Sequence, residues 1–195
     1  KIMQSYISIG VMSGTSLDGL DLVACRFTFD QSWNYEIIKT LTIPYSHKWV
    51  TKLSTATELN ALDFAFLNND FGKFIGKQVA EFCTDLPQKP DLVSSHGHTV
   101  FHQPQNKLTV QIGSGASIAA YSGLRTACDF RTLDVALKGQ GAPLVPIGDE
   151  LLFGDYDFCL NLGGIANVSF REDGERRAFD ICPANMAFNQ FIKEL

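Results

Sequence analysis

The chain has 195 residues, of which 45% are hydrophobic and 19% are charged, and its formal net charge is −5. This composition is that of a folded globular protein and excludes an intrinsically disordered chain. The acidity disfavours nucleic acid as a partner, although backbone N–H groups and a bound cation can still hold nucleotide phosphates locally.

The five cysteines are scattered, odd in number and without C-x-x-C spacing, which disfavours a disulfide framework and favours a reducing compartment. Residues 1–9 are too short and too polar for a secretory signal, and no apolar run is long enough to span a bilayer. We therefore expect a cytoplasmic protein without a membrane partner.

Three strands are predicted at the start of the chain, at residues 6–11, 20–27 and 35–43. A loop of small residues, 12–19, joins the first two strands and leaves no room for a helix. We expect these strands to form an antiparallel meander.

Residues 58–82 are the best helical stretch, with a break expected at Asn68, Asn69 and Gly72. The apolar stripe of this helix is expected to consist of Leu59, Leu62, Phe66, Val79 and Phe82.

Shorter elements follow in the rest of the chain. Strands are predicted at residues 91–95, 108–112, 125–130, 158–162 and 167–170. Helices are predicted at residues 117–121, 144–153 and 186–195, with Pro143 in the first turn of the second of these. Strands that alternate with helices after an opening of pure strands indicate an α/β fold with a mixed sheet flanked by helices.

A first glycine-bearing loop, Gly14-Thr15-Ser16-Leu17-Asp18-Gly19, has the composition of an anion-binding turn. Its small residues let the backbone approach a ligand, and consecutive N–H groups can cradle a phosphate. Asp18 or Asp21 can hold a magnesium ion. The loop is not a Walker loop, because the G-x-x-x-x-G-K-[ST] pattern is absent and a strand follows it. The alternative is an ordinary hairpin turn.

A second loop, Gly163-Gly164-Ile165-Ala166-Asn167, repeats this pattern between two predicted strands. Alone it indicates a tight hairpin. Two such hairpins that face each other can clamp a polyphosphate from both sides.

Acidic and glycine-rich segments lie next to each other at residues 129–134 and 139–144. A carboxylate such as that of Asp134, beside a flexible loop, can accept a proton from a sugar hydroxyl or from water. The alternative roles are a helix N-cap and a surface salt bridge.

Three histidines, His96, His98 and His102, follow a predicted strand, where ligand sites of α/β sheets gather. A zinc site is the weaker interpretation, because the segment is expected to break at Gly97 and no further ligand has suitable spacing. We expect these histidines to offer hydrogen bonds to a polar ligand.

Taken together, these segments resemble the anhydro-N-acetylmuramic acid kinase family. The resemblance is carried by residues 9–21, 95–100, 110–113, 129–131, 134, 139–146 and 161–168.

The resemblance implies an actin-like ATPase (ribonuclease H-like) fold of two lobes with ATP and Mg²⁺ between them. It implies a carbohydrate kinase that phosphorylates the 6-oxygen of 1,6-anhydro-N-acetylmuramic acid while water opens the anhydro bridge. The product would be N-acetylmuramic acid 6-phosphate, in peptidoglycan recycling. On this reading residues 1–170 are the first lobe and residues 171–195 begin a second, whose remainder lies outside the chain, so we expect the chain alone to be inactive.

The resemblance also assigns residues to roles. Asp134 matches the general base that deprotonates the attacking water, and Asp18 is the expected magnesium ligand. The sugar side is matched by His96, Thr99 and Asp129. The nucleotide side is matched by Gly14, Thr15, Ser16, Leu17, Asp18, Gly19, Leu20, Asp21, Gly163, Gly164 and Asn167.

Four residues depart from the family pattern: His98 replaces a glutamine, and Lys138, Cys182 and Ala184 replace glycines. They keep open a kinase for a different amino sugar. A second alternative is an Hsp70-like ATP-binding chaperone domain, which would have no need of Asp134 and its loop. The oligomeric state is left open, with a homodimer as one option.

Overall fold

The structure is a computed structural model that describes residues 4–194. Three long strands, β1 (Gln4–Ser13), β2 (Gly19–Asp30) and β3 (Ser32–Pro44), open the chain. They pair as antiparallel neighbours, as Ile9 opposite Ala24 and Leu22 opposite Leu41 illustrate. The predicted meander is confirmed.

A fourth strand, β4 (Leu92–Gln103), lies parallel to β1 and is the centre of the main sheet. Its first half pairs with β6 (Thr126–Cys128) in parallel, and its second half pairs with β5 (Leu108–Ile112) antiparallel. The sheet order is β3-β2-β1-β4-β5, with β6 also beside β4. The sheet therefore combines the antiparallel meander β1–β3 with two parallel pairings, β4 with β1 and β6 with β4. This is the mixed sheet of ribonuclease H-like folds, as expected.

The strand β4 does not break at Gly97, contrary to the prediction. Gly97 has φ of +72°, and a Cβ there would lie 2.5 Å from the carbonyl oxygen of Ile112. Glycine therefore lets the strand continue through a left-handed residue beside β5.

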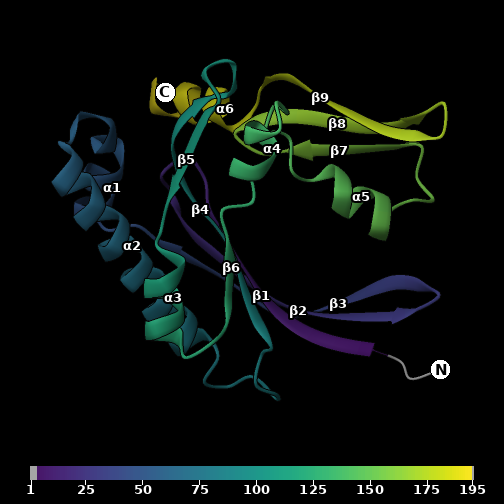
Figure 1. Ribbon diagram of the computed structural model, residues 1–195, viewed down its shortest axis with the longest axis horizontal. Helices are drawn as coiled ribbons and strands as arrows, with labels where there is room; N and C mark the ends of the chain where they lie inside the picture. The colour runs from purple at the N-terminus through teal and green to yellow at the C-terminus, as the bar shows by residue number, and fades with distance from the viewer. Residues whose placement is uncertain (1–3, 195) are drawn as a thin grey trace.

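Helices α1 (His47–Ser54), α2 (Ala61–Phe82) and α3 (Gly115–Ser122) cover one face of the main sheet (Figure 1). Short 3₁₀ turns lie between α1 and α2, at Ala56–Glu58, and between β4 and β5, at Pro104–Asn106. The side chain of Asn60 caps α2 by accepting hydrogen bonds from the N–H groups of Leu62 and Asp63. The positive-φ residue Gly123 ends α3, as predicted.

The helix α2 is continuous, so the break predicted near Gly72 is wrong. A Cβ on Gly72 would lie 2.6 Å from the carbonyl oxygen of Ser114, so this glycine brings α2 and α3 into close contact. The predicted apolar stripe is also wrong in its first half, because Leu62 and Phe66 are exposed. The buried face follows the contact with α3 and the sheet, and consists of Leu67, Phe71, Gly72, Ile75, Gly76, Val79 and Phe82.

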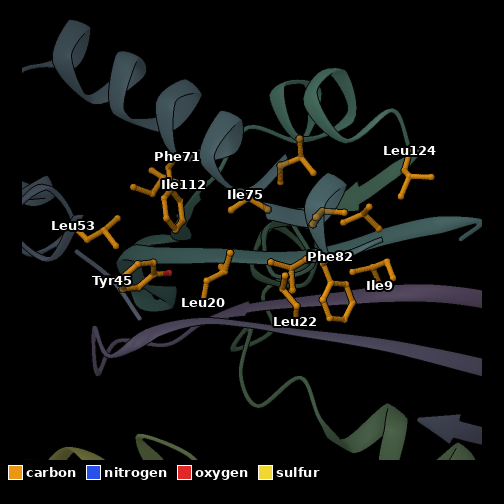
Figure 2. Close-up of a cluster of buried hydrophobic side chains, with 14 of the residues drawn as sticks. Ile9, Leu20, Leu22, Tyr45, Leu53, Phe71, Ile75, Phe82, Ile112 and Leu124 are labelled. Atoms are coloured by element: carbon orange, nitrogen blue, oxygen red, sulfur yellow. The ribbon is translucent and has the colours of Figure 1, made fainter. Parts of the chain in front are cut away.

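The main core lies between α2 and the sheet (Figure 2). Phe71 and Ile75 of α2 are fully buried against Ile9 of β1 and Leu20 of β2. Full burial of one such side chain contributes roughly 1.5–3 kcal/mol, so this layer holds α2 against β1 and β2.

A second, separate sheet consists of β7 (Phe158–Leu162), β8 (Ile165–Glu172) and β9 (Glu175–Pro183), all antiparallel. The two strands predicted around the Gly163-Gly164 turn are confirmed, and β9 was not predicted. The lobe boundary expected at residue 170 falls inside β8.

Three helices accompany this second sheet: α4 (Thr132–Ala136), α5 (Pro146–Leu152) and α6 (Asn185–Glu194). The first was not predicted. The helix predicted from residue 144 starts at Pro146, so Pro143 precedes it instead of occupying its first turn. The predicted helix at 186–195 is confirmed up to Glu194, and Leu195 lies outside the described residues.

The second sheet and α5 lie across from the face of the main sheet that α1–α3 leave free (Figure 1). Tyr35 of β3 and Phe153 beside α5 meet edge to face, with ring centroids 5.7 Å apart. No helix within residues 4–194 is long and apolar enough to cross a membrane.

Candidate functional site

A cleft of about 1130 Å³ lies between the two sheets. Its walls come from the β1–β2 hairpin, β3, the first half and middle of β4, the segment before α5 and its first turn, the β7–β8 hairpin and β9. The volume exceeds that of most single-ligand pockets, which suits a site for two substrates.

The β1–β2 hairpin contributes Gly14, Thr15 and Asp21 to the cleft. Its turn closes with a 3.5 Å hydrogen bond from Leu17 N–H to the Gly14 carbonyl, and Leu17 adopts φ of +58°. Small residues at the turn thus leave backbone groups open to a ligand.

The remaining predicted residues of this loop have other surroundings. The Ser16 hydroxyl donates to the Asp18 carboxylate at 2.9 Å, and both lie outside the described lining. Gly19 packs on the backbone of β3, because a Cβ there would lie 2.7 Å from the Ile43 carbonyl oxygen. Leu20 is buried in the core.

The β7–β8 hairpin contributes Gly164 and Asn167 from the opposite side. The carbonyls of Gly163 and Gly164 accept hydrogen bonds from the N–H groups of Asn185 and Ala184, so the start of α6 holds this turn in place. Both glycine-bearing hairpins therefore line one cleft.

Arg131 forms a hydrogen bond with His96, which the sequence resemblance assigned to the sugar side. Arg131 Nε donates to His96 Nε2 at 2.9 Å, and His96 Nδ1 lies 2.9 Å from the Gly97 carbonyl oxygen. These partners assign the ring hydrogen to Nδ1, and burial together with the nearby guanidinium lowers the pKa of His96. Among the described residues of the cleft, Arg131 is the one Lys or Arg side chain.

Thr99 also lines the cleft, whereas Asp129 lines a smaller side pocket that shares His96 with it. Asp129 adopts φ of +61°, and its carboxylate accepts a hydrogen bond from the Thr132 hydroxyl.

Asp134 is absent from the described lining of the cleft. Its carboxylate accepts a 2.7 Å hydrogen bond from Gly141 N–H, and its carbonyl accepts one from Gly139 N–H at 2.8 Å. A Cβ on Gly139 would collide with this carboxylate. Asp134 therefore holds the shape of the loop that carries Ala142 and Pro143 to the cleft.

Two carboxylates line the cleft in the described part of the chain, those of Asp21 and Asp180. Asp21 accepts a 2.6 Å hydrogen bond from the Thr42 hydroxyl. Asp180 is exposed on β9 opposite Asn167, and it interacts electrostatically with Arg131. The sequence analysis did not select Asp180, although its position just before the Cys182 and Ala184 departures was a usable signal.

The four departures from the family pattern have different surroundings. His98 is buried and bonds Ser13, so it belongs to the core and not to the cleft. Lys138 is exposed with φ of +76°, a conformation that favours glycine. Cys182 is exposed at the end of β9, and Ala184 is buried against the second hairpin.

The arrangement offers backbone loops from two sides, two carboxylates and one guanidinium. Backbone N–H groups in such turns bind phosphate oxygens, and carboxylates can hold a divalent cation or accept a proton. The cleft is therefore suited to a polyphosphate beside a second polar substrate.

Three comparisons with known proteins show what the chain is similar to. The family model described as Anhydro-N-acetylmuramic acid kinase matches residues 5–195. An anhydro-N-acetylmuramic acid kinase of Pseudoalteromonas translucida is 36% identical over 97% of this chain and 53% of its own length. One from Bacillus thuringiensis is 34% identical over 96% of this chain and 54% of its own length.

A solved structure of Thermus thermophilus RuvC is similar over 78% of this chain and 81% of its own, with 16% identity and a TM-score of 0.35. The chain spans about half the length of the curated relatives it matches. Because the family model matches residues 5–195, the chain belongs to the anhydro-N-acetylmuramic acid kinase family.

Proposed function

We propose that the whole protein is an ATP-dependent kinase that converts 1,6-anhydro-N-acetylmuramic acid into N-acetylmuramic acid 6-phosphate in the cytoplasm, as a step of peptidoglycan recycling. The observation that carries the proposal is that Gly14 and Thr15 of one hairpin and Gly164 and Asn167 of the other line the same cleft. Residues from both sheets thus surround one space that is large enough for nucleotide and sugar.

The residues present fit a magnesium nucleotide. Gly14 and Thr15 line the cleft, and Asp21, which carries a carboxylate, lines it as well. Asp21 is the better placed Mg²⁺ ligand, because Asp18 bonds Ser16 outside the described lining. The cation would neutralise charge on the transferring phosphoryl group.

Asp180 is the carboxylate that the geometry favours as the general base. It lines the cleft beside Arg131, whereas the Asp134 carboxylate is bound to Gly141 N–H. In this role Asp180 takes a proton from water as the water oxygen bonds to the anomeric carbon. The bridge C–O bond breaks, and its oxygen, the 6-oxygen, attacks the γ-phosphorus of ATP while the bond from that phosphorus to the β,γ-bridging oxygen breaks and ADP leaves. Asp134 would then act through its loop as a positioning residue, and it stays the alternative base.

His96 and Thr99 would face the sugar, with Asp129 next to them in the side pocket. Since His98 is buried in the core, its departure from the family pattern does not argue for a different sugar. We also propose Phe158 instead of residue 171 as the start of the second lobe, because β7, β8 and β9 form one sheet.

The test is phosphate transfer by the protein in its full natural length, followed by ³¹P NMR. ATP, Mg²⁺ and the anhydro sugar together should give a sugar 6-phosphate, whereas omission of the sugar should leave ATP intact. A correctly folded full-length protein that consumes no ATP with this sugar would contradict the proposal.

A further inference from the structure

Tyr45, which directly follows β3, contacts both ends of the glycine-bearing loop between β1 and β2. Its backbone N–H donates to the Asp18 carbonyl at 3.3 Å. Its hydroxyl donates to Ser13 Oγ at 2.8 Å. Ser13 is the last residue of β1 and precedes Gly14, whereas Asp18 directly precedes β2. One residue from outside the loop therefore holds its two ends.

The loop has weak support of its own. The hydrogen bond that closes its turn, from Leu17 N–H to the Gly14 carbonyl, is 3.5 Å long, whereas such a bond is ordinarily about 2.9–3.0 Å. The hydrogen bond from Ser16 to Asp18 joins side chains that water can reach. The position of the turn relative to the cleft therefore depends on contacts made from outside the loop.

The Tyr45 hydroxyl has a fixed position, because the tyrosine ring is packed in the main core (Figure 2). The ring is buried, and its centroid lies 6.3 Å from that of Phe71 and 6.2 Å from that of Phe74, both on α2. Burial raises the pKa of Tyr45 to about 12, so the phenol keeps its hydrogen and donates at neutral pH.

Ser13 connects this support to the cleft. It is only 2% exposed, and it lines the cleft directly before Gly14. Its Oγ accepts the hydrogen bond from Tyr45 and lies 3.2 Å from Nδ1 of His98, a buried residue of β4. The end of β1 is thus bonded to two buried rings, and through them to the core.

We propose that Tyr45 is a positioning residue for the nucleotide, whose hydroxyl holds Ser13 and the adjoining Gly14-Thr15 turn in the conformation that binds the phosphates of ATP. Tyr45 is not among the described residues that line the cleft, so it acts through the loop and not by contact with ATP. A loop that is already ordered binds its ligand without a further cost in conformational entropy. The inference rests on the proposed function, because that function makes this loop a phosphate site.

The first test is Tyr45→Phe in the protein of full natural length. Phenylalanine keeps the ring and the backbone N–H, so the substitution removes the hydroxyl alone. Isothermal titration calorimetry with magnesium ATP should show an affinity about fivefold lower, as expected for the loss of one hydrogen bond. The kcat/KM for the anhydro sugar at saturating ATP should change less than about twofold, because the sugar side keeps its contacts.

Asn60→Ala is the control for a general loss of stability. It removes the cap of α2, where the Asn60 side chain accepts from the N–H groups of Leu62 and Asp63. Loss of a cap lowers the unfolding free energy to an extent similar to the loss of a buried hydrogen bond. Affinity for ATP should stay at the wild-type value in this variant. Equal weakening in both variants, or unchanged affinity in Tyr45→Phe, would overturn the proposal.

A double-mutant cycle tests whether Tyr45 acts through Ser13. Ser13→Ala removes the acceptor of the hydrogen bond, so it should also weaken ATP binding. Tyr45→Phe added to Ser13→Ala should have almost no further effect, because the bond between the two side chains is already absent. A second fivefold loss in the double variant would contradict this route.

The outcomes separate this proposal from the kinase proposal. Phosphorylation of the anhydro sugar by wild-type protein, with unchanged ATP affinity in Tyr45→Phe, would end the positioning role and leave the kinase intact. Binding of magnesium ATP that depends on the Tyr45 hydroxyl, without transfer to this sugar, would do the reverse. Wild-type protein that binds no magnesium ATP would overturn both.

Discussion

His98 Nδ1 lies 3.2 Å from Ser13 Oγ, in the buried seam where β4 runs parallel to β1. The Tyr45 hydroxyl donates to the same Ser13 oxygen at 2.8 Å, which leaves the Ser13 hydrogen available for the imidazole nitrogen. Burial, with a smaller effect of His96, lowers the pKa of His98 to about 4. The seam therefore requires a neutral histidine.

Because the folded chain keeps His98 neutral, we expect the unfolding free energy to fall in mild acid. The unfolded chain binds a proton at His98 near pH 6.5, whereas the folded chain does so near pH 4. The stability contribution is therefore complete above pH 6.5 and is lost as the pH falls towards 4, by about 3 kcal/mol in total. Urea unfolding at pH 7, 6 and 5 measures it.

His98→Gln is the matched variant, because glutamine does not titrate. Its unfolding free energy should fall less between pH 7 and pH 5 than that of the wild type, with a remainder from His96, whose pKa is also lowered. Identical pH slopes for the two proteins would show that His98 is not the titrating group.

Gly97→Ala tests the left-handed residue inside β4. The substitution adds a Cβ that would lie 2.5 Å from the Ile112 carbonyl oxygen, at φ of +72°. We expect a loss of at least about 2 kcal/mol in unfolding free energy, because steric overlap adds to backbone strain.

Gly123→Ala is the control for that change. Gly123 has φ of +69°, and nothing lies within 4 Å of a Cβ there, so only the strain of about 1 kcal/mol applies. Equal losses in both variants would mean that the contact with Ile112 does not matter.

Asp180→Asn and Asp134→Asn separate the two candidate bases in the full-length kinase. Asp180→Asn should lower kcat by roughly 10²–10⁴-fold while leaving ATP affinity nearly unchanged. Asparagine at 134 still offers an oxygen to Gly141 N–H, so Asp134→Asn should lower kcat less than tenfold. The reverse order would return the base role to Asp134, as the sequence resemblance implied.

Much of the fold was predictable because its signals are local. The strands β1–β3 show apolar alternation with a turn too short for a helix, and Gly123 marks the end of α3. The buried face of α2 was not predictable, because Gly72 reads as a weak point in the sequence, whereas in the structure Gly72 and Gly76 are contact points with α3. That role depends on a helix more than thirty residues away.

The site was predictable to the extent that its loops are short and rich in glycine. The Gly14 and Gly164 hairpins could be selected because the same glycine-bearing pattern occurs between two pairs of predicted strands, although each loop alone is also typical of an ordinary hairpin turn. Asp180 was not selected because its position in the cleft depends on the pairing of β9 with β8, and β9 was not predicted. The side pocket also depends on pairing, since β4 brings Ser95 beside residues of β5 and β6.

Titration of the ¹⁵N-labelled protein in its full natural length with magnesium ATP tests the central claim most directly, because both hairpins line the cleft. Two hairpins that hold one polyphosphate should shift together, so the backbone amides of Gly14, Thr15, Gly164 and Asn167 should follow one binding curve. Gly123 and Gly174, at turns outside the described lining of the cleft, should not move. A response confined to one hairpin, or no response in either, would contradict the account.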